Sequence, residues 1–189
     1  MLYKLHIYKL YILLIYMGGK MFFIKSVIYI LIFSSSTYIG ILISKQYTNR
    51  VKELNELKSA LNVLKTKIRY TNAPLYSIFK ELSDTCKGNV SNLFKNVCKN
   101  MKNNSAQIAW ENAVKTESLS LYKEDREALI TMGNLLGKTD LNGQISEIEL
   151  TEIFLETQLV DAQNQRNKNE KLYKTLGIVT GIGIIVILI

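Results

Sequence analysis

Very few residues in this sequence could carry acid-base or metal chemistry, and they do not form a catalytic pattern. The chain has one histidine, His6, and two cysteines, Cys86 and Cys98. A lone histidine cannot supply the ligands of a soft-metal site. The cysteines fall at apolar positions of helical patterns, which favours buried reduced thiols over a disulfide framework. We therefore expect no catalytic residue, no metal and no cofactor.

Two segments approach known ligand-binding motifs but miss the spacing that the chemistry requires. Residues 133–139 read GNLLGKT, with three residues between the glycines where a phosphate loop needs four. Residues 140–143 read DLNG, which places the glycine of a calcium loop two positions early and Thr151 where its bidentate glutamate belongs. Both motifs are rejected, and the sequence predicts no enzyme.

Charged and apolar residues occupy different parts of the chain. The formal net charge is +8, and all 16 acidic residues lie between Glu53 and Glu170. Residues 45–174 hold 20 Lys and Arg against these 16 acids, so their excess is only +4 and both signs are interspersed. Nucleic-acid binding depends on clustered positive charge. We therefore predict no nucleic-acid partner.

Both ends of the chain are apolar. Residues 26–43 contain no charge and would span roughly 27 Å as a helix, while residues 175–189 would span roughly 22 Å. We predict transmembrane helices over 22–43 and 173–189. No cleavage site follows the first, so a retained anchor is favoured over a signal peptide. The positive-inside rule places residues 45–172 in the cytoplasm, because basic residues flank the inner ends of both spans: Lys45, Arg50, Lys52, Arg166, Lys168, Lys171 and Lys174.

Residues 1–20 fit this topology poorly, because Lys4, Lys9 and Lys20 would lie on the wrong side of the membrane. We interpret them as a non-native extension and predict that translation starts at Met21. Within the two spans, small residues recur four positions apart: Ser36 with Gly40, and Gly177 with Gly181. Such pairs let helices approach closely in lipid, although they also arise by chance.

The middle of the chain has the periodicity of amphipathic helices. Apolar residues from Val51 to Ile68 recur every three or four positions, and the same spacing returns around Phe79, Phe94 and Leu129. The only proline, Pro74, suits the first turn of a helix, Ser105 suits an N-cap and Gly137 a C-cap. A long helix from about Leu141 to Tyr173 runs on into the second span. No segment alternates with period two, so the fold is predicted to be all-α with short loops.

Three glutamates on this long helix, Glu149, Glu152 and Glu156, share one face. They form either an ordinary solvated surface or a docking surface for a basic partner. Trp110 is expected to be a core anchor rather than a contact residue.

The order of these features resembles the stage III sporulation protein AB family of endospore-forming Firmicutes. A membrane anchor and a basic helix precede Pro74-Leu75, the sequence AWE around Trp110 follows, and a charged helix leads to an apolar tail. The most specific piece runs from Gly133 to Gln144 and resembles the family's Gly-x-x-Leu-Gly-x-x-Asp region, through Gly133, Leu136, Gly137 and Asp140. The resemblance covers residues 21–189.

The resemblance implies a cytoplasmic six-helix bundle similar to the F domain of the inner-membrane platform protein of type II secretion and type IV pilus machines. It implies a non-enzymatic platform in the mother-cell-derived membrane around the forespore, within a secretion-like channel complex. The implied partners are a secretion-type ATPase, stage III sporulation protein AA, and other stage III sporulation channel proteins; a homo-oligomer is compatible with this. The alternatives are a membrane-anchored helical adaptor or sensor unrelated to secretion, and a holin-like or toxin-like membrane protein.

Overall fold

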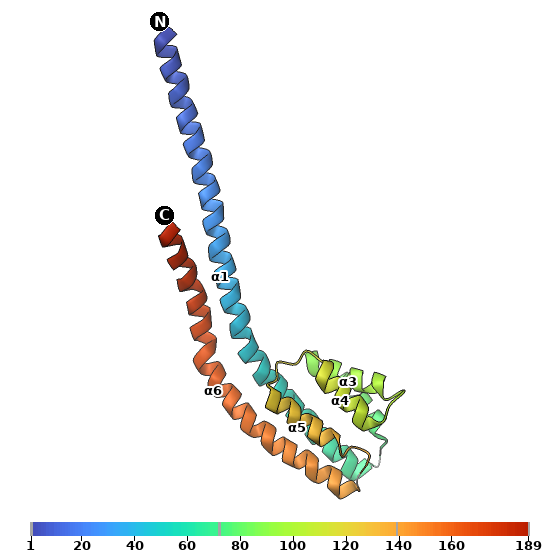
Figure 1. Cartoon of the computed structure of the whole chain (residues 1–189). Helices are drawn as coiled ribbons and strands as arrows, with labels where there is room; N and C mark the ends of the chain where they lie inside the picture. The colour runs from blue at the N-terminus through green and yellow to red at the C-terminus, as the bar shows by residue number, and fades with distance from the viewer. Residues whose placement is uncertain (1, 72, 139, 189) are drawn as a thin grey trace. The chain divides into compact units, whose positions relative to one another are not determined.

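The computed structural model describes residues 2–71, 73–138 and 140–188, with side chains from residue 23 onward, and within them it contains six helices and no strand. The all-α fold class is therefore confirmed. The predicted extension over residues 1–20 lies outside the described side chains, and the start at Met21 stays a prediction. The helices are α1 (Leu2–Thr71), α2 (Leu75–Thr85), α3 (Gly88–Asn100), α4 (Ala106–Thr116), α5 (Lys123–Gly133) and α6 (Leu141–Leu188) (Figure 1).

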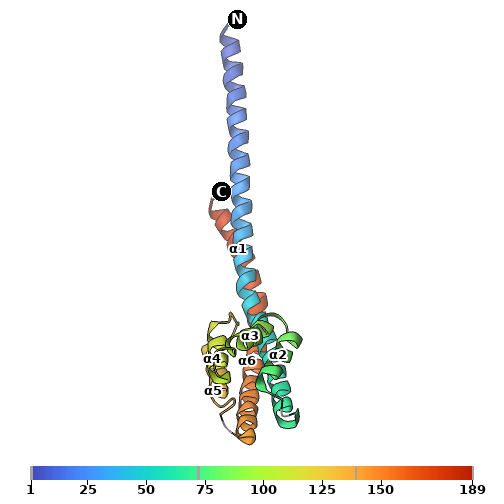
Figure 2. The same ribbon diagram turned by 90° about the vertical axis from the view of Figure 1, so that its right-hand side faces the viewer.

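The chain divides into two units. The central unit comprises residues 45–170: the second part of α1, the four short helices, and the first part of α6. Within this unit, α2 to α5 lie around the two long helices (Figure 2). The terminal unit comprises residues 1–44 and 171–189 and holds only the remaining parts of α1 and α6. The boundaries predicted from the sequence, at 22–43, 45–172 and 173–189, stay predictions.

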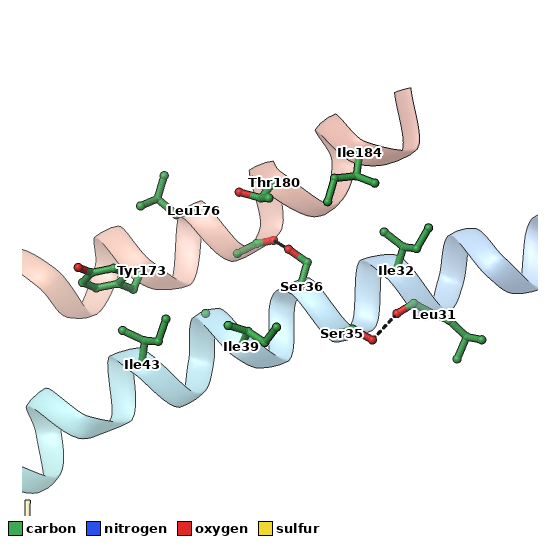
Figure 3. A pocket seen from close by; sticks show the side chains of 12 residues that line it. Leu31, Ile32, Ser35, Ser36, Ile39, Ile43, Tyr173, Leu176, Thr180 and Ile184 are labelled. Carbon is green, nitrogen blue, oxygen red and sulfur yellow. Dashed lines mark hydrogen bonds between the residues drawn. The ribbon is translucent and has the colours of Figure 1, made fainter. Parts of the chain in front are cut away.

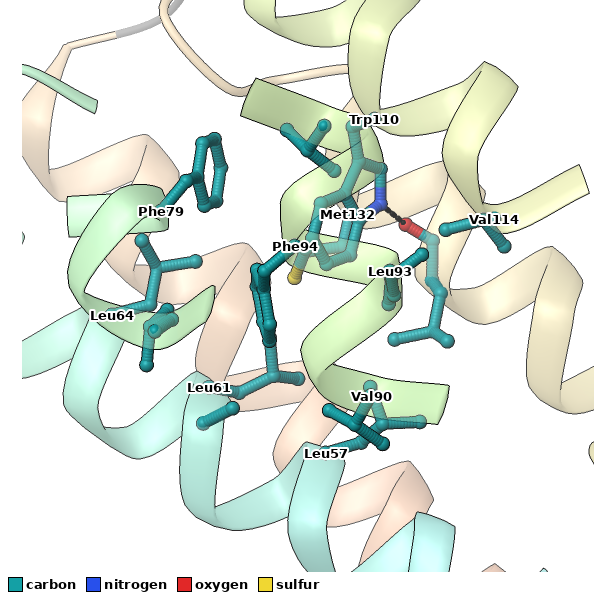
Figure 4. Close-up of a cluster of buried hydrophobic side chains, with 14 of the residues drawn as sticks. Leu57, Leu61, Leu64, Phe79, Val90, Leu93, Phe94, Trp110, Val114 and Met132 are labelled. Carbon is teal, nitrogen blue, oxygen red and sulfur yellow. Dashed lines mark hydrogen bonds between the residues drawn. The ribbon is translucent and has the colours of Figure 1, made fainter. Parts of the chain in front are cut away.

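The core of the central unit is built from the apolar faces that the periodicity indicated. The α1 leucines at 54, 57, 61 and 64 are all fully buried. Phe79, Phe94 and Trp110 belong to the same core, and their rings lie 5.8–6.0 Å apart (Figure 4). Aromatic rings at this separation add stabilisation beyond the area that they bury. The three rings thereby hold α2, α3 and α4 to one another.

Local sequence signals explain most helix ends. Pro74 directly precedes α2, and its missing N–H costs nothing there because first-turn amides have no intrahelical acceptor. The Ser105 side chain accepts a hydrogen bond from the Ile108 amide, which confirms the predicted N-cap of α4. The predicted end of the fifth helix differs: α5 stops at Gly133, and residues 134–138 continue in turns to Gly137, whose φ is +73°. Glycine adopts this left-handed conformation without the strain of a Cβ.

Two helices are long and apolar enough to cross a membrane, those containing Phe23–Thr71 and Leu141–Leu188. Their most apolar 18-residue windows have mean hydropathies of 1.9 and 1.7, and only 6% of each window is buried inside the protein. A core helix of a water-soluble protein would be mostly buried. By length and composition, these two described stretches could therefore span a membrane.

Candidate functional site

A buried ion pair joins α1, α5 and α6 within the central unit. Arg50 of α1 is only 3% exposed and Asp125 of α5 is fully buried. The Arg50 Nε and Nη2 atoms donate to both carboxylate oxygens of Asp125 at 3.0–3.2 Å, and Nη2 also donates to Gln158 Oε1 of α6 at 2.9 Å. The guanidinium lies 3.7 Å above the centre of the Tyr122 ring. A bidentate, stacked arginine of this kind fixes the geometry of three helices at one point.

The sequence places both charged residues on apolar faces. Arg50 lies four and seven residues before Leu54 and Leu57, so it falls on the buried stripe of α1. Asp125 lies four residues before Leu129 and also accepts a hydrogen bond from the Tyr122 amide at 2.9 Å, which caps α5. A second arginine, Arg126, donates to the carbonyls of Val114, Glu117 and Leu119 at the end of α4. The sequence predicted Arg50 only as a basic residue flanking the first span and did not single out Asp125, although charge at an apolar position was the available signal.

The three predicted docking glutamates pair with basic residues of α1. Glu149 accepts from Arg69 at 3.0 Å, and Glu152 and Glu156 form ion pairs with Lys65 and Lys58. A basic partner would have to compete with cations that already lie beside these carboxylates. The proximity of α1 to α6 explains their position, and their role in docking stays a prediction.

Trp110 and the segment from Gly133 to Gln144, which carry the family resemblance, lie where helices meet. Trp110 is fully buried, and its Nε1 donates to the Leu129 carbonyl at 2.7 Å. A Cβ on Gly133 would fall 2.9 Å from this Nε1 and closer still to the indole Cδ1. Any larger residue at position 133 would therefore force the tryptophan to move from this place. Leu136, also of this segment, is buried in the same core.

Three other residues of the segment from Gly133 to Gln144, namely Gly137, Asp140 and Gln144, lie in or next to the turn between α5 and α6. The Gly137 amide donates to Gln144 Oε1 at 3.2 Å, and a Cβ on Gly137 would lie 3.5 Å from Leu75 Cδ1. Asp140 accepts from the Gly143 amide at 3.1 Å, in the first turn of α6. Leu75, which follows Pro74, thus lies beside the turn that precedes α6 and packs against the core.

In the terminal unit, α1 and α6 pack through the small residues that the sequence singled out. A Cβ on Gly40 would lie 2.6 Å from the Tyr173 carbonyl oxygen and 3.0 Å from the Gly177 Cα. Ser36 Oγ donates to the Gly177 carbonyl at 2.7 Å, and a Cβ on Gly181 would meet Ser36 Cβ at 3.3 Å. The structure therefore brings all four residues together, as a specific helix pair requires.

This helix pair borders an apolar groove of about 580 Å³ (Figure 3). Aliphatic side chains such as Leu31, Ile39 and Leu176 line it, and Ser35 turns its hydroxyl inward to the Leu31 carbonyl of its own helix. Among the described residues that line the groove, Tyr173 is the only titratable one, and so apolar a lining suits hydrocarbon rather than a polar substrate.

The two thiols are poor candidates for chemistry. Cys98 is buried, as predicted, and Cys86 is half-buried; both are free. Burial, with a smaller contribution from the Glu56 carboxylate, raises the pKa of Cys86 to about 11, and burial also raises the pKa of Cys98. At neutral pH both are protonated and weakly nucleophilic. Among the described residues, no group of three His, Cys, Asp or Glu side chains could hold a metal ion.

Comparison with known proteins decides the family. A sequence profile of stage III sporulation protein AB matches residues 25–189. The chain belongs to this family. Stage III sporulation protein AB of Bacillus subtilis (strain 168) is 32% identical over 158 residues, which cover 82% of this chain and 92% of that relative. A solved structure of stage III sporulation protein AB has a TM-score of 0.60 and 29% identity, and the match covers 64% of this chain and 98% of that chain.

Membership of the stage III sporulation protein AB family confirms the resemblance drawn from Pro74, Trp110 and residues 133–144, and it establishes a role in sporulation. The names of both relatives describe a sporulation protein and no enzymatic activity. The structure adds what the motif residues do: they pack helices and fix junctions rather than face a cavity with reactive groups.

Proposed function

We propose that this sporulation protein is a membrane platform that couples a cytoplasmic ATPase to a secretion-like channel complex between mother cell and forespore. In this proposal the terminal unit spans the membrane around the forespore, and the central unit lies in the cytoplasm. The partners are the secretion-type ATPase, stage III sporulation protein AA, and other stage III sporulation channel proteins.

The observation that carries the proposal is the Arg50 cluster. It clamps α1 and α6 to α5 in the central unit, and α1 and α6 are also the two helices that contain the candidate membrane spans. A force applied to the short helices would reach both long helices through this clamp. The packed core transmits such a displacement because close-packed interiors deform little.

In the terminal unit, the two candidate spans touch at the Gly40–Gly177 contact. Close backbone approach at two glycines lets one helix shift or rotate against the other without moving large side chains. Mechanical coupling needs such an element with more than one accessible packing. In the proposed order of events, the ATPase first changes shape, the helices of the central unit move with it, and the helix pair of the terminal unit then rearranges.

The test is binding of the full-length chain, held in lipid nanodiscs, to the purified secretion-type ATPase. We expect saturable binding at micromolar concentrations and loss of spore formation when the chain is deleted. The double variant Arg50→Met/Asp125→Leu, which removes the clamp while keeping the space filled, should bind the ATPase but fail to restore sporulation. Absence of binding by the wild-type chain would refute the coupling role.

A separate measurement addresses location. A fluorescent fusion to the full chain should form a ring around the forespore and should remain with membranes after alkaline carbonate washing. A chain that washes into the soluble fraction would contradict the membrane platform, whatever the outcome of the binding assay.

A further inference from the structure

The positive charge between the two predicted membrane spans is concentrated next to those spans. Residues 45–52 and 161–174 together hold seven Lys and Arg but only two acidic residues. Residues 53–160, which lie between these segments, hold 13 Lys and Arg against 14 acidic residues. The excess of positive charge between the spans therefore lies entirely in the two short segments beside them.

The parts of these segments that belong to the central unit lie side by side. The Thr48 hydroxyl of α1 donates to the Glu170 carboxylate of α6 at 3.3 Å. Close to this contact in sequence are three exposed lysines, which we call the juxtamembrane lysines: Lys45 on α1, and Lys168 and Lys171 on α6. None of the three forms an ion pair with a residue that the structure describes. Their charge is therefore available to a partner outside the chain.

Farther from the predicted spans, the same two helices pair their charges with each other. Three cations of α1 each have a glutamate of α6 beside them, in the pairs Lys58–Glu156, Lys65–Glu152 and Arg69–Glu149. A cation that already has such a neighbour offers little net charge to a partner outside the chain. Within the described residues, the lack of such pairs at the juxtamembrane lysines is thus a local feature and not a general property of α1 and α6.

Distance along the chain places the juxtamembrane lysines close to the lipid headgroups. Lys45 lies just after the predicted end of the first span at Ile43, and Lys168 and Lys171 lie just before the predicted start of the second at Tyr173. With a rise of about 1.5 Å per helical residue, all three lie within about 3–8 Å of a span end along the helix axis. A lysine side chain is long enough to bring its ammonium group to the headgroup layer. The positive-inside rule fixes the side on which such residues stay during insertion, but it requires no lasting contact with lipid.

We infer that the juxtamembrane lysines bind the anionic headgroups of membrane lipids and so gather acidic phospholipid around the two spans. The inference rests on the membrane anchoring in the proposed function but not on the ATPase. Headgroups with a net negative charge complement exposed ammonium groups, and basic residues this close to a bilayer are attracted to acidic lipids. A zwitterionic headgroup carries no net charge and gains little. The attraction needs no particular arrangement of the two units, because it depends only on where the lysines lie along each helix.

The test uses the full-length chain in nanodiscs made of equal parts phosphatidylglycerol and phosphatidylcholine, which expose both faces of the bilayer and so remove any effect of topology. Native mass spectrometry of the released chain counts the lipids of each kind that stay bound. We expect about threefold more bound phosphatidylglycerol than phosphatidylcholine. The variant Lys45→Gln/Lys168→Gln/Lys171→Gln should reduce this ratio by about half. Equal binding of the two lipids by the wild-type chain would overturn the inference.

A matched variant separates the position of the charge from its amount. Lys95→Gln/Lys99→Gln/Lys102→Gln removes the same charge from three exposed lysines on and just after α3, which also form no ion pair among the described residues. It should keep the wild-type ratio, and an equal loss in both variants would refute the role of the juxtamembrane lysines. A chain that fails to enter nanodiscs would contradict the membrane anchoring of the proposed function. A chain that enters them but shows no lipid preference would refute only the lipid inference.

Discussion

The helices α1 and α6 pack against each other through different kinds of side chain in the two units. In the central unit α1 and α6 meet through large leucines, a buried arginine and a series of ion pairs. In the terminal unit they meet through glycines and the hydroxyls of Ser36 and Tyr29, and most of their large apolar side chains are exposed. Water rewards burial of large side chains, whereas lipid does not, so close backbone contact must supply the attraction there.

Each unit is packed as expected for the solvent that the proposed function gives it, water for the central unit and lipid for the terminal unit. Arg50 and Asp125 show that the central unit can hold paired charge inside: Asp125 accepts from Arg50 Nε and Nη2, while Nη1 has no hydrogen bond within the described residues and lies 3.8 Å from the Asp161 carboxylate. The side-chain contacts described between the spans include two donors, Ser36 and Tyr29, and each bonds a backbone carbonyl. A substitution that removes a large buried side chain or a paired charge should therefore destabilise the central unit and leave the terminal unit intact. A substitution that adds bulk at the glycines should do the reverse.

The largest effect should come from Trp110→Ala in the central unit. The substitution empties a fully buried site beside Phe79 and Phe94 and leaves the Leu129 carbonyl without its donor. We expect a loss of about 3–5 kcal/mol in the free energy of unfolding. Urea denaturation of the full chain in detergent, followed by circular dichroism, measures it. Tyr70→Ala, at a side chain 75% exposed, is the control and should change stability by less than about 0.5 kcal/mol.

A comparable loss should follow from Arg50→Met, because it leaves the Asp125 carboxylate buried without its cation. We expect about 3–5 kcal/mol. The double variant Arg50→Met/Asp125→Leu should recover most of this loss, apart from about 1 kcal/mol for the α5 cap that Asp125 provides. A double-mutant cycle in urea measures the coupling. Additive effects would show that the two side chains do not form one unit.

The Arg50 cluster also shows where sequence reasoning fails. Periodicity correctly located the helices around Leu54, Phe79 and Leu129, because water forces apolar residues to one face. The same periodicity places Arg50 on the buried stripe of α1 but does not say which charge it pairs with. Its partners come from helices far apart in sequence, so only the assembled fold brings the charges together. Gly40 and Gly177, by contrast, could be identified from the sequence. In a continuous apolar segment a small residue stands out from its large neighbours and marks a place where another helix can approach.

The terminal unit should respond to bulk rather than to charge. Gly177→Leu would drive a side chain into the Ser36 carbonyl, which lies 2.9 Å from the added Cβ and belongs to a helix backbone. We expect the helix pair to weaken by about 1–2 kcal/mol. Gly183→Leu is the matched control, since nothing lies within 4 Å of a Cβ there.

A disulfide reports this helix pair directly. Phe33→Cys and Gly181→Cys place two thiols at facing positions, because a Cβ on Gly181 lies 3.4 Å from the Phe33 Cα. In a chain that also lacks Cys86 and Cys98, Gly177→Leu should reduce the intramolecular disulfide about tenfold, while urea unfolding of the central unit stays unchanged. If Gly177→Leu also destabilised the central unit, the two units would not be packed independently.

The smallest effect should come from Lys65→Gln, which removes a cation at the surface of the central unit. The side chains of Lys65 and its partner Glu152 are 18% and 13% exposed, and Glu149, 3.9 Å away, is 44% exposed. Water reaches these pairs more than it reaches the Arg50 pair, so the expected loss is about 1 kcal/mol, smaller than that of Arg50→Met, and should shrink in molar salt. Lys123→Gln, at a pair 83% and 62% exposed, should cost still less. If Lys65→Gln destabilised the chain as much as Arg50→Met, burial would not set the strength of these pairs, and α1 and α6 would be held by charge along their whole contact.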